Sequence, residues 1–265
     1  MTDEDLSQAA KSLIAAYGDR SPIPPLTDTY PGLTVEAAYD IQLRQVAQWT
    51  AEGRVIRGHK VGLTSTVMQR QLGVDQPDYG HLFADMFHLE TLPIDTSTFI
   101  SPRVEPEIAF VLGRPLAGPG VSVADAISAV DYVLPALEII DSRIADWKIT
   151  LADTIADNAS SAGVVLGSTP TYLDRCDLRL TGCVVHQGGE VVGTGAGGAV
   201  LGSPINALVW LANTVGPLGI TLDAGSVIMP GSLTAAVAVT PGQSVTATFD
   251  GIGSVTASFA PQETA

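Results

Sequence analysis

The stretch Arg103-Val-Glu-Pro-Glu-Ile-Ala-Phe-Val-Leu112 has the composition of a buried β-strand, yet it contains two carboxylates, Glu105 and Glu107. Alternate residues of a strand point to the same face, so these two side chains lie roughly 6.6 Å apart along one face. Burying two like charges side by side is unfavourable unless a cation lies between them. A divalent metal ion is the simplest such cation.

A third carboxylate, Glu138, has similar surroundings. It is the only polar residue of the apolar stretch Val133-Leu-Pro-Ala-Leu-Glu-Ile-Ile140. Three isolated glutamates would form an all-oxygen site of the kind that hard cations such as Mg²⁺ and Mn²⁺ prefer. The alternative from spacing alone is that each glutamate faces solvent at a sheet edge, or pairs with Arg103 or Arg143.

The composition limits the class of protein. The chain has 265 residues, 46% of them apolar, and a net charge of −15, which argues against binding to a nucleic-acid backbone. The two cysteines, Cys176 and Cys183, fit neither a metal clip nor a disulfide framework. The acidic N-terminus does not resemble a signal peptide, and no apolar run reaches the ~18 residues of a membrane span. We therefore expect a cytoplasmic protein without a membrane partner.

The sequence predicts an α+β fold, with an N-terminal helical region followed by a mixed β-sandwich or roll. Helical spacing continues from a Thr2 cap to Gly18, and again from Thr34 to about Glu52. We expect a helical cap region over residues 1–53 and a β-rich catalytic domain over residues 54–265.

Further elements are expected along the β-rich part. Strands are predicted over residues 55–63, 103–113 and 132–140, with a Ser122-capped helix before the last of them. A short helix is predicted from Thr64 or Ser65 through Gln71, and another from Ser203-Pro204 to Val215. Glycine-containing turns predict two hairpins, with strands over 178–185 and 191–192 and over 244–249 and 254–259.

Two further residues are candidates for chemistry. Lys60, one of three lysines, lies in the glycine-flanked segment Gly58-His-Lys-Val-Gly62. A partly desolvated lysine binds carboxylates or transfers protons, and the alternative is a surface lysine at a strand end. Asp78 lies in Gln76-Pro-Asp-Tyr-Gly80, where turn chemistry is the simpler interpretation. The four histidines have no H-x-x-x-H spacing, which disfavours a zinc site.

Five segments in order resemble the 2-keto-4-pentenoate (2-hydroxypenta-2,4-dienoate) hydratases of the fumarylacetoacetate hydrolase superfamily, and the resemblance covers nearly the whole chain. The segments are Gly58-His-Lys-Val-Gly-Leu-Thr-Ser65, Gly73-Val-Asp-Gln-Pro-Asp-Tyr-Gly80, Arg103-Val-Glu-Pro-Glu107, Pro135-Ala-Leu-Glu138 and Asp146-Trp-Lys-Ile-Thr-Leu-Ala-Asp-Thr-Ile-Ala-Asp-Asn-Ala-Ser160. One departure is Pro106, where the family carries Ala or Val. Because proline lacks an N–H, this position should be unpaired on that side or lie at an edge.

The resemblance implies the roles of individual residues. Lys60 and Asp78 are implied as catalytic residues, and Ser160 and Leu82 as substrate-binding residues. The metal, Mg²⁺ or Mn²⁺, is implied to be held by Glu105, Glu107 and Glu138, and would polarise the 2-oxo group of the substrate.

The implied activity is the addition of water to 2-hydroxypenta-2,4-dienoate, giving 4-hydroxy-2-oxopentanoate, in the meta-cleavage degradation of aromatic compounds. The nearest alternative is a 4-oxalocrotonate decarboxylase, which releases CO₂. Extra cationic groups in the pocket would favour this alternative. Carbon–carbon bond hydrolysis is less favoured, because the chain has no His-Glu dipeptide. A non-catalytic subunit is a further alternative. The resemblance also implies a homo-oligomer, such as a ring of dimers, and a complex with a pathway decarboxylase.

Overall fold

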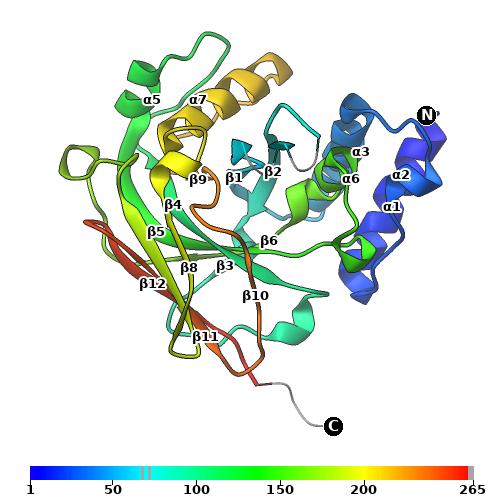
Figure 1. Ribbon diagram of the computed structural model, residues 1–265. Helices are drawn as coiled ribbons and strands as arrows, with labels where there is room; N and C mark the ends of the chain where they lie inside the picture. Colours follow the sequence, from blue (N-terminus) through cyan, green and yellow to red (C-terminus); the bar gives the residue numbers. More distant parts are fainter. Residues whose placement is uncertain (67–68, 71–72, 262–265) are drawn as a thin grey trace.

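The computed structural model of the protein describes residues 1–66, 69–70 and 73–261. Two β-sheets form its body, and three N-terminal helices pack on one side of it together with a later helix (Figure 1). The arrangement is the predicted one, helices first and a curled, mixed β-structure after them.

The N-terminal helices are α1 (Asp3–Asp19), α2 (Leu26–Thr29) and α3 (Val35–Ala51). Thr2 caps α1 as expected, and Thr34 caps α3, each by accepting a hydrogen bond from a backbone N–H group of the first turn. The predicted end of α1 at Gly18 was wrong. The helix continues to Asp19, and Arg20 takes the left-handed conformation that ends it, with φ 51°.

The larger sheet has the strand order β2-β1-β9-β4-β5-β6-β3, and β10 pairs with β4 on the same side as β9. Its two longest strands, β4 and β5, are the predicted ones and form an antiparallel pair at its centre. The strand bounds are β1 Ile56–Gly62, β2 Asp78–Phe83, β3 Phe87–His88, β4 Arg103–Leu112, β5 Val130–Ile140, β6 Ser161–Leu166, β9 Val227–Met229 and β10 Val237–Ala238.

The second sheet has the order β12-β11-β7-β8, with β7 Gly182–Gln187, β8 Glu190–Ala196, β11 Ser244–Phe249 and β12 Gly253–Ser258. The predicted start of β7 at Leu178 was wrong. The Asp177 side chain accepts hydrogen bonds from the backbone N–H groups of Arg179 and Leu180, so this segment forms a turn. The hairpin turn itself consists of Gly188 and Gly189, both with positive φ.

Short helices connect these strands. The α-helices are α5 Val123–Ala129, α6 Leu151–Ala156 and α7 Pro204–Val215. Single turns are η1 Ala84–Met86, η2 Thr96–Thr98, η3 Ala145–Trp147, η4 Asn158–Ser160, η5 Leu173–Arg175, η6 Gly197–Ala199 and η7 Gly216–Leu218. The Ser122 cap of α5 and the Ser203-Pro204 start of α7 are confirmed. The short helix predicted through Gln71 lies partly outside the described residues.

One stretch, Gly197–Leu218, is long and apolar enough by composition to span a membrane, among the residues that the structure describes. It comprises η6, α7 and η7 rather than one regular α-helix. Within it, Leu208, Leu211 and Val215 are fully buried in the protein core. Helix α7 therefore serves as a core helix in this fold.

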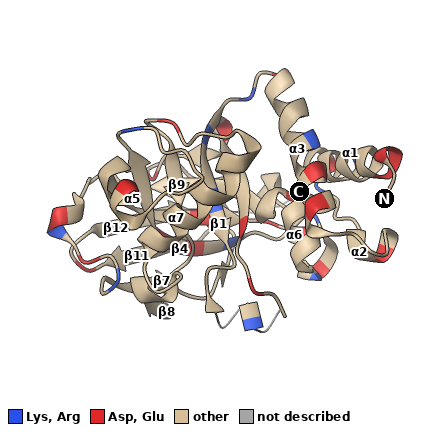
Figure 2. Ribbon diagram, turned by 90° about the horizontal axis from the view of Figure 1, so that it is seen from above, with Lys and Arg blue, Asp and Glu red and all other residues tan. Residues whose placement is uncertain are grey.

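Charge is distributed unevenly along the chain. Figure 2 shows Asp and Glu on the N-terminal helices and on the β-rich body, while Lys and Arg are scattered singly. The net charge of −15 follows from 28 Asp and Glu residues against 13 Lys and Arg residues.

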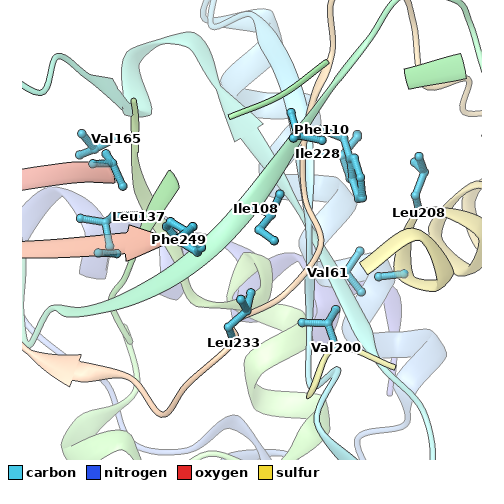
Figure 3. Close-up of a cluster of buried hydrophobic side chains, with 14 of the residues drawn as sticks. Val61, Ile108, Phe110, Leu137, Val165, Val200, Leu208, Ile228, Leu233 and Phe249 are labelled. Carbon is cyan, nitrogen blue, oxygen red and sulfur yellow. The ribbon is translucent and has the colours of Figure 1, made fainter. Parts of the chain in front are cut away.

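The main hydrophobic core lies between the two sheets and under α7. Leu137 on β5 and Phe249 on β11 lie close together in this core, and Ile108 and Phe110 extend it along β4 (Figure 3). A separate cluster joins α1 and α3 to α6, with Leu13, Ile41 and Ile155 fully buried. The N-terminal helices are thereby fixed to the segment that precedes β6.

We predict that Leu137→Ala will lower the free energy of unfolding by about 2–5 kcal/mol, because it removes fully buried methyl groups and leaves a cavity between the sheets. Denaturant unfolding followed by circular dichroism measures the loss. Leu89→Ala is the matched control, since Leu89 is 67% exposed, and should change stability by less than about 0.5 kcal/mol. Equal effects of the two substitutions would contradict this description of the core.

Candidate active site

The pairing of β4 with β5 brings the three glutamates together. Glu105 lies directly opposite Glu138, and Glu107 shares a face of β4 with Glu105, two residues further along. One carboxylate oxygen from each residue lies within 4.8 Å of the others. Glu107 and Glu138 are fully buried and Glu105 is partly exposed. Like charges directly opposite in a sheet destabilise it, so the arrangement requires a counter-charge.

The register also explains how Pro106 is accommodated between two of these residues. Strand β9 pairs with β4 at Phe110 and Val111, and β10 pairs with it at Arg103 and Val104, so no strand covers Pro106 on that side. The Pro106 carbonyl accepts a hydrogen bond from Leu233 N–H at 3.0 Å, across this gap. The N–H that proline lacks would point the same way. The expectation of an unpaired position is confirmed, and both carboxylates keep their places.

Hydrogen bonding leaves most of the carboxylate oxygens free. Glu107 Oε2 accepts a hydrogen bond from Gly231 N–H at 2.8 Å. Its Oε1 and both oxygens of Glu138 are buried and have no hydrogen-bond partner within the described part of the chain. Unpaired buried carboxylate oxygens are costly, and several converging on one point have the donor set of a hard divalent cation.

Burial and mutual repulsion change the acidity of the cluster. Burial raises the pKa of Glu138 to about 7 and raises the pKa of Glu105. The pKa of Glu107 is raised well above its ordinary value, by burial first and then by the carboxylates of Glu138 and Glu105. Burial is the largest cause for all three residues, neighbouring carboxylates add to it, and the positive charge of Lys60 counteracts the rise. The residues present therefore fit a bound divalent metal ion.

Lys60 is the cation nearest to the cluster among the described residues. It lies on β1 and is 4% exposed, and its Nζ donates a hydrogen bond to the Ala159 carbonyl at 2.9 Å. The same Nζ lies 3.4 Å from Glu138 Oε1. Burial alone would lower the pKa of Lys60, but the carboxylates of Glu138, Asp78 and both β4 glutamates outweigh it and raise the pKa. The side chain is therefore an ammonium group.

Asp78 is not part of an exposed turn. It begins β2 opposite Gly62, is 1% exposed, and its Oδ1 has no hydrogen-bond partner in the described chain. Burial raises its pKa, and the positive charge of Lys60 counteracts that rise. A Cβ at position 62 would run into Asp78 Oδ1, so Gly62 makes room for this carboxyl group.

A cavity of about 390 Å³ opens beside the cluster. Lys60, Asp78, Glu105 and Ser160 line it, which brings four of the predicted site residues to one place. Glu107 and Glu138 lie just beneath, at the base of the carboxylate cluster. The other lining residues are mostly apolar: Gly62, Leu63, Arg103, Ile140, Trp147, Ile149, Thr154, Ala159, Thr234, Ala235 and Ala236.

Leu82, unlike the other predicted site residues, lies neither at this cavity nor in the carboxylate cluster. It shares a face of β2 with Asp78, but lies four residues further along the strand. There it is fully buried in a hydrophobic cluster with Val46 and Trp49 of α3. Its position fits a packing role.

Sequence reasoning missed two lining residues, Arg103 and Trp147. The guanidinium carbon of Arg103 lies 4.4 Å from the centre of the Trp147 ring, and Trp147 Nε1 donates to the Ser101 carbonyl at 3.0 Å. Asp146 and Trp147 both have positive φ, 57° and 56°, which places the indole over the arginine. No sequence signal shows that residues 44 positions apart stack on each other.

The comparisons with known proteins agree with this geometry. Residues 64–260 match the model of the fumarylacetoacetate (FAA) hydrolase C-terminal family, well over half of the chain. The chain belongs to the fumarylacetoacetate hydrolase family. The five sequence segments that carry the resemblance contain the glutamate cluster, Lys60, Asp78 and Ser160.

Within this family, the chain is similar to enzymes that act on small 2-oxo acids. It is 48% identical over 259 residues to a 2-keto-4-pentenoate hydratase of Paraburkholderia xenovorans (strain LB400), covering 98% of this chain and 96% of that one. It is 40% identical over 256 residues to a 2-oxo-hept-4-ene-1,7-dioate hydratase of Escherichia coli, covering 94% of this chain and 96% of that one. The 4-oxalocrotonate decarboxylase of Pseudomonas putida G7, solved with magnesium and adipate, has a TM-score of 0.94 at 39% identity, with 98% of both chains covered.

We predict that Glu107→Gln will have opposite effects on stability in the absence and presence of metal. Without metal, the variant should be more stable than the wild type near pH 8. The raised pKa of Glu107 means that folding must either protonate this carboxyl group or bury its charge, a cost that the neutral amide avoids. With Mn²⁺, the wild type should gain more stability than the variant, since only the intact cluster binds the ion tightly. Thermal unfolding with EDTA and with Mn²⁺ measures both effects, and the same stabilisation by Mn²⁺ in both proteins would contradict the metal assignment.

Proposed function

We propose that this protein is a hydro-lyase that adds water to 2-hydroxypenta-2,4-dienoate and forms 4-hydroxy-2-oxopentanoate. The observation that carries the proposal is the buried glutamate cluster, with Lys60 and Asp78 beside it in one small cavity. The similarity to a 2-keto-4-pentenoate hydratase over nearly the whole chain supports the choice of reaction. The role in the meta-cleavage degradation of aromatic compounds follows from that substrate.

The metal would be Mg²⁺ or Mn²⁺, held by Glu105, Glu107 and Glu138. Their all-oxygen donor set suits both ions, and the decarboxylase of similar structure was solved with magnesium. When bound, the ion would supply Lewis-acid polarisation of the substrate's 2-oxo group. Two of these three glutamates are fully buried, and the third is partly exposed and lines the cavity.

Lys60 and Asp78 would carry the proton chemistry. In the first step, the C2 hydroxyl group loses its proton and C5 gains one, giving a conjugated ketone. A water molecule then adds across the C3–C4 double bond, with its oxygen bonding to C4 and one proton going to C3. The whole reaction takes up one water molecule. The Lys60 ammonium is placed to stabilise negative charge developing on the substrate. Asp78, with a raised pKa and a free oxygen, is the candidate for proton transfer.

Ser160 lies at the cavity wall, with its Oγ 3.3 Å from Thr154 Oγ1. These two hydroxyl groups can bind the attacking water or a substrate oxygen, because each keeps capacity for a further hydrogen bond. Their place on the same wall as Lys60 supports the predicted substrate-binding role of Ser160.

A 4-oxalocrotonate decarboxylase is the second candidate, and one observation favours it. Arg103 adds a second cation to the cavity wall, and no ion pair involves it among the residues that the structure describes. An arginine stacked on an indole keeps its edge free to bind a carboxylate with two hydrogen bonds. The substrate of the decarboxylase carries such a second carboxylate.

We also propose that the protein works as a cytoplasmic homo-oligomer, for which a ring of dimers and a complex with a pathway decarboxylase are the expected forms. Val191 and Val192 support an interface, because they are 57% and 42% exposed on the edge strand β8. Analytical ultracentrifugation of the purified protein tests for the oligomer.

The first test of function compares two substrates. We predict that the purified protein with Mg²⁺ or Mn²⁺ will convert freshly generated 2-hydroxypenta-2,4-dienoate without releasing CO₂. Ultraviolet absorbance follows loss of the dienol, and mass spectrometry identifies the hydrated product. Release of CO₂ from 2-oxohex-3-enedioate, with no hydration of the pentadienoate, would show that the decarboxylase is the correct assignment.

A second test concerns Arg103. Adipate should inhibit the hydration competitively, and Arg103→Gln should weaken that inhibition about 10–100-fold, because a charge-assisted hydrogen bond is worth about 1.5–3 kcal/mol. The KM for 2-hydroxypenta-2,4-dienoate, which lacks a second carboxylate, serves as the internal control and should change less than about threefold. Equal changes in both quantities would show that Arg103 does not distinguish the two kinds of ligand.

A further inference from the structure

The side chain of Asn158 takes the place of a strand at the free edge of β2. Its Oδ1 accepts a hydrogen bond from His81 N–H at 2.8 Å, and its Nδ2 donates to the His81 carbonyl at 2.9 Å. This is the pair of bonds that a neighbouring strand would make. Asn158 is fully buried, and the segment it begins leads directly into β6. The carboxamide therefore links β2 to the approach of β6.

The backbone of this segment lies unusually close to β2. A Cβ on Gly80 would run into the carbonyl oxygen of Asn158, and would lie 2.8 Å from Ser161 Oγ. That hydroxyl itself donates to the Asn158 carbonyl at 2.8 Å. Position 80 requires glycine because the turn occupies the space of its side chain.

The conformation of the turn is intrinsically unfavourable. Asn158, Ala159 and Ser160 have φ values of 50°, 52° and 55°, so three consecutive non-glycine residues are left-handed. This conformation is unfavourable for residues with a Cβ, so surrounding contacts must hold the turn in place. One such contact is made by Asp157, next to the turn, whose Oδ1 lies 2.6 Å from Arg143 Nε in a buried ion pair. Another is the pairing of Asn158 with His81.

This turn has a direct contact with the active site. Its central carbonyl, that of Ala159, accepts the 2.9 Å hydrogen bond from Lys60 Nζ. The position of the ammonium group between this carbonyl and Glu138 thus depends on where the turn lies. We propose that Asn158 is a positioning residue for Lys60, acting through the left-handed turn that it fixes to β2. The kinetic part of this inference rests on the proposed hydratase function.

The test uses a substitution that removes one hydrogen bond with little change in shape. Asn158→Asp keeps the acceptor for His81 N–H but places an oxygen opposite the His81 carbonyl. The chain offers a matched control in Asn213, whose Oδ1 accepts from Val121 N–H at 2.8 Å and whose Nδ2 donates to the Val121 carbonyl at 2.9 Å. Asn213 lies on α7 and does not line the cavity. Asn213→Asp thus breaks the same pair of contacts away from the site.

The first readout reports on Lys60 independently of activity. The chain has three lysines, and the other two, Lys11 and Lys148, are exposed. In protein labelled with ¹⁵N-lysine, the Nζ signal of Lys60 should be distinct and its hydrogen exchange slow. We expect Asn158→Asp to shift that signal and speed its exchange, and Asn213→Asp to leave it unchanged. An unshifted signal in a folded Asn158→Asp variant would overturn the proposal.

The second readout is catalytic. We expect Asn158→Asp to lower kcat for the pentadienoate at least tenfold while the dissociation constant for Mn²⁺ changes less than threefold, because the three glutamates lie on other strands. Asn213→Asp should keep kcat within twofold of wild type at a comparable loss of stability. A kcat for Asn158→Asp equal to that of Asn213→Asp would contradict the positioning role.

Gly80→Ala provides an independent variant. Its added Cβ should displace the turn, while residue 158 remains an asparagine. It should shift the Lys60 signal in the same way, and it decides the question if Asn158→Asp does not fold. A wild-type Lys60 signal in folded Gly80→Ala would overturn the proposal. If the wild-type protein hydrates no pentadienoate, the proposed function fails, while the spectroscopic comparison still decides whether Asn158 positions Lys60.

Discussion

The structure depends on one unfavourable interaction, the repulsion among three glutamates that β4 and β5 hold on one buried face. Glu105 and Glu138 are direct cross-strand neighbours, and Glu107 follows on the same face. Burial raises the pKa of each of them, because a carboxylate is less stable as a charged group away from water. Selection for stability alone would favour apolar residues at these three positions, and most other residues of both strands are apolar.

The groups around the cluster hold its carboxylates in a position to bind a ligand. Pro106 is tolerated because β4 lacks a partner strand at that point, where the 231–233 segment instead donates to Glu107 and to the Pro106 carbonyl. Lys60 supplies a single positive charge from β1, and a left-handed turn supplies the carbonyl that holds it. Each part comes from a different strand or connection, so the site exists only when both the sheet and its connections are complete.

The same cavity chemistry suits hydration and decarboxylation, because both reactions need negative charge stabilised next to a 2-oxo group. What distinguishes them lies at the cavity wall rather than at the glutamates. Arg103, stacked on Trp147, offers a site for a second carboxylate, while Leu63, Ile140 and Ile149 offer an apolar surface. Similarity to two hydratases and a decarboxylase of 2-oxo acids narrows the expected chemistry, and the proposed role of this wall is to select among such substrates.

The sequence by itself determined the strands β4 and β5, the helix caps at Thr2 and Ser122, and the three glutamates, because apolar periodicity and isolated buried charges are local signals. It misplaced the ends of α1 and β7, where side-chain capping by Asp177 and a left-handed Arg20 overrode composition. The substrate-binding role of Leu82 was implied only by the family resemblance, and the sequence could not tell that this end of β2 packs against α3. Only the tertiary structure placed Arg103 on Trp147, Lys60 against Ala159 and Asn158 against His81, because these contacts join residues 44, 99 and 77 positions apart, and no local pattern encodes such distances.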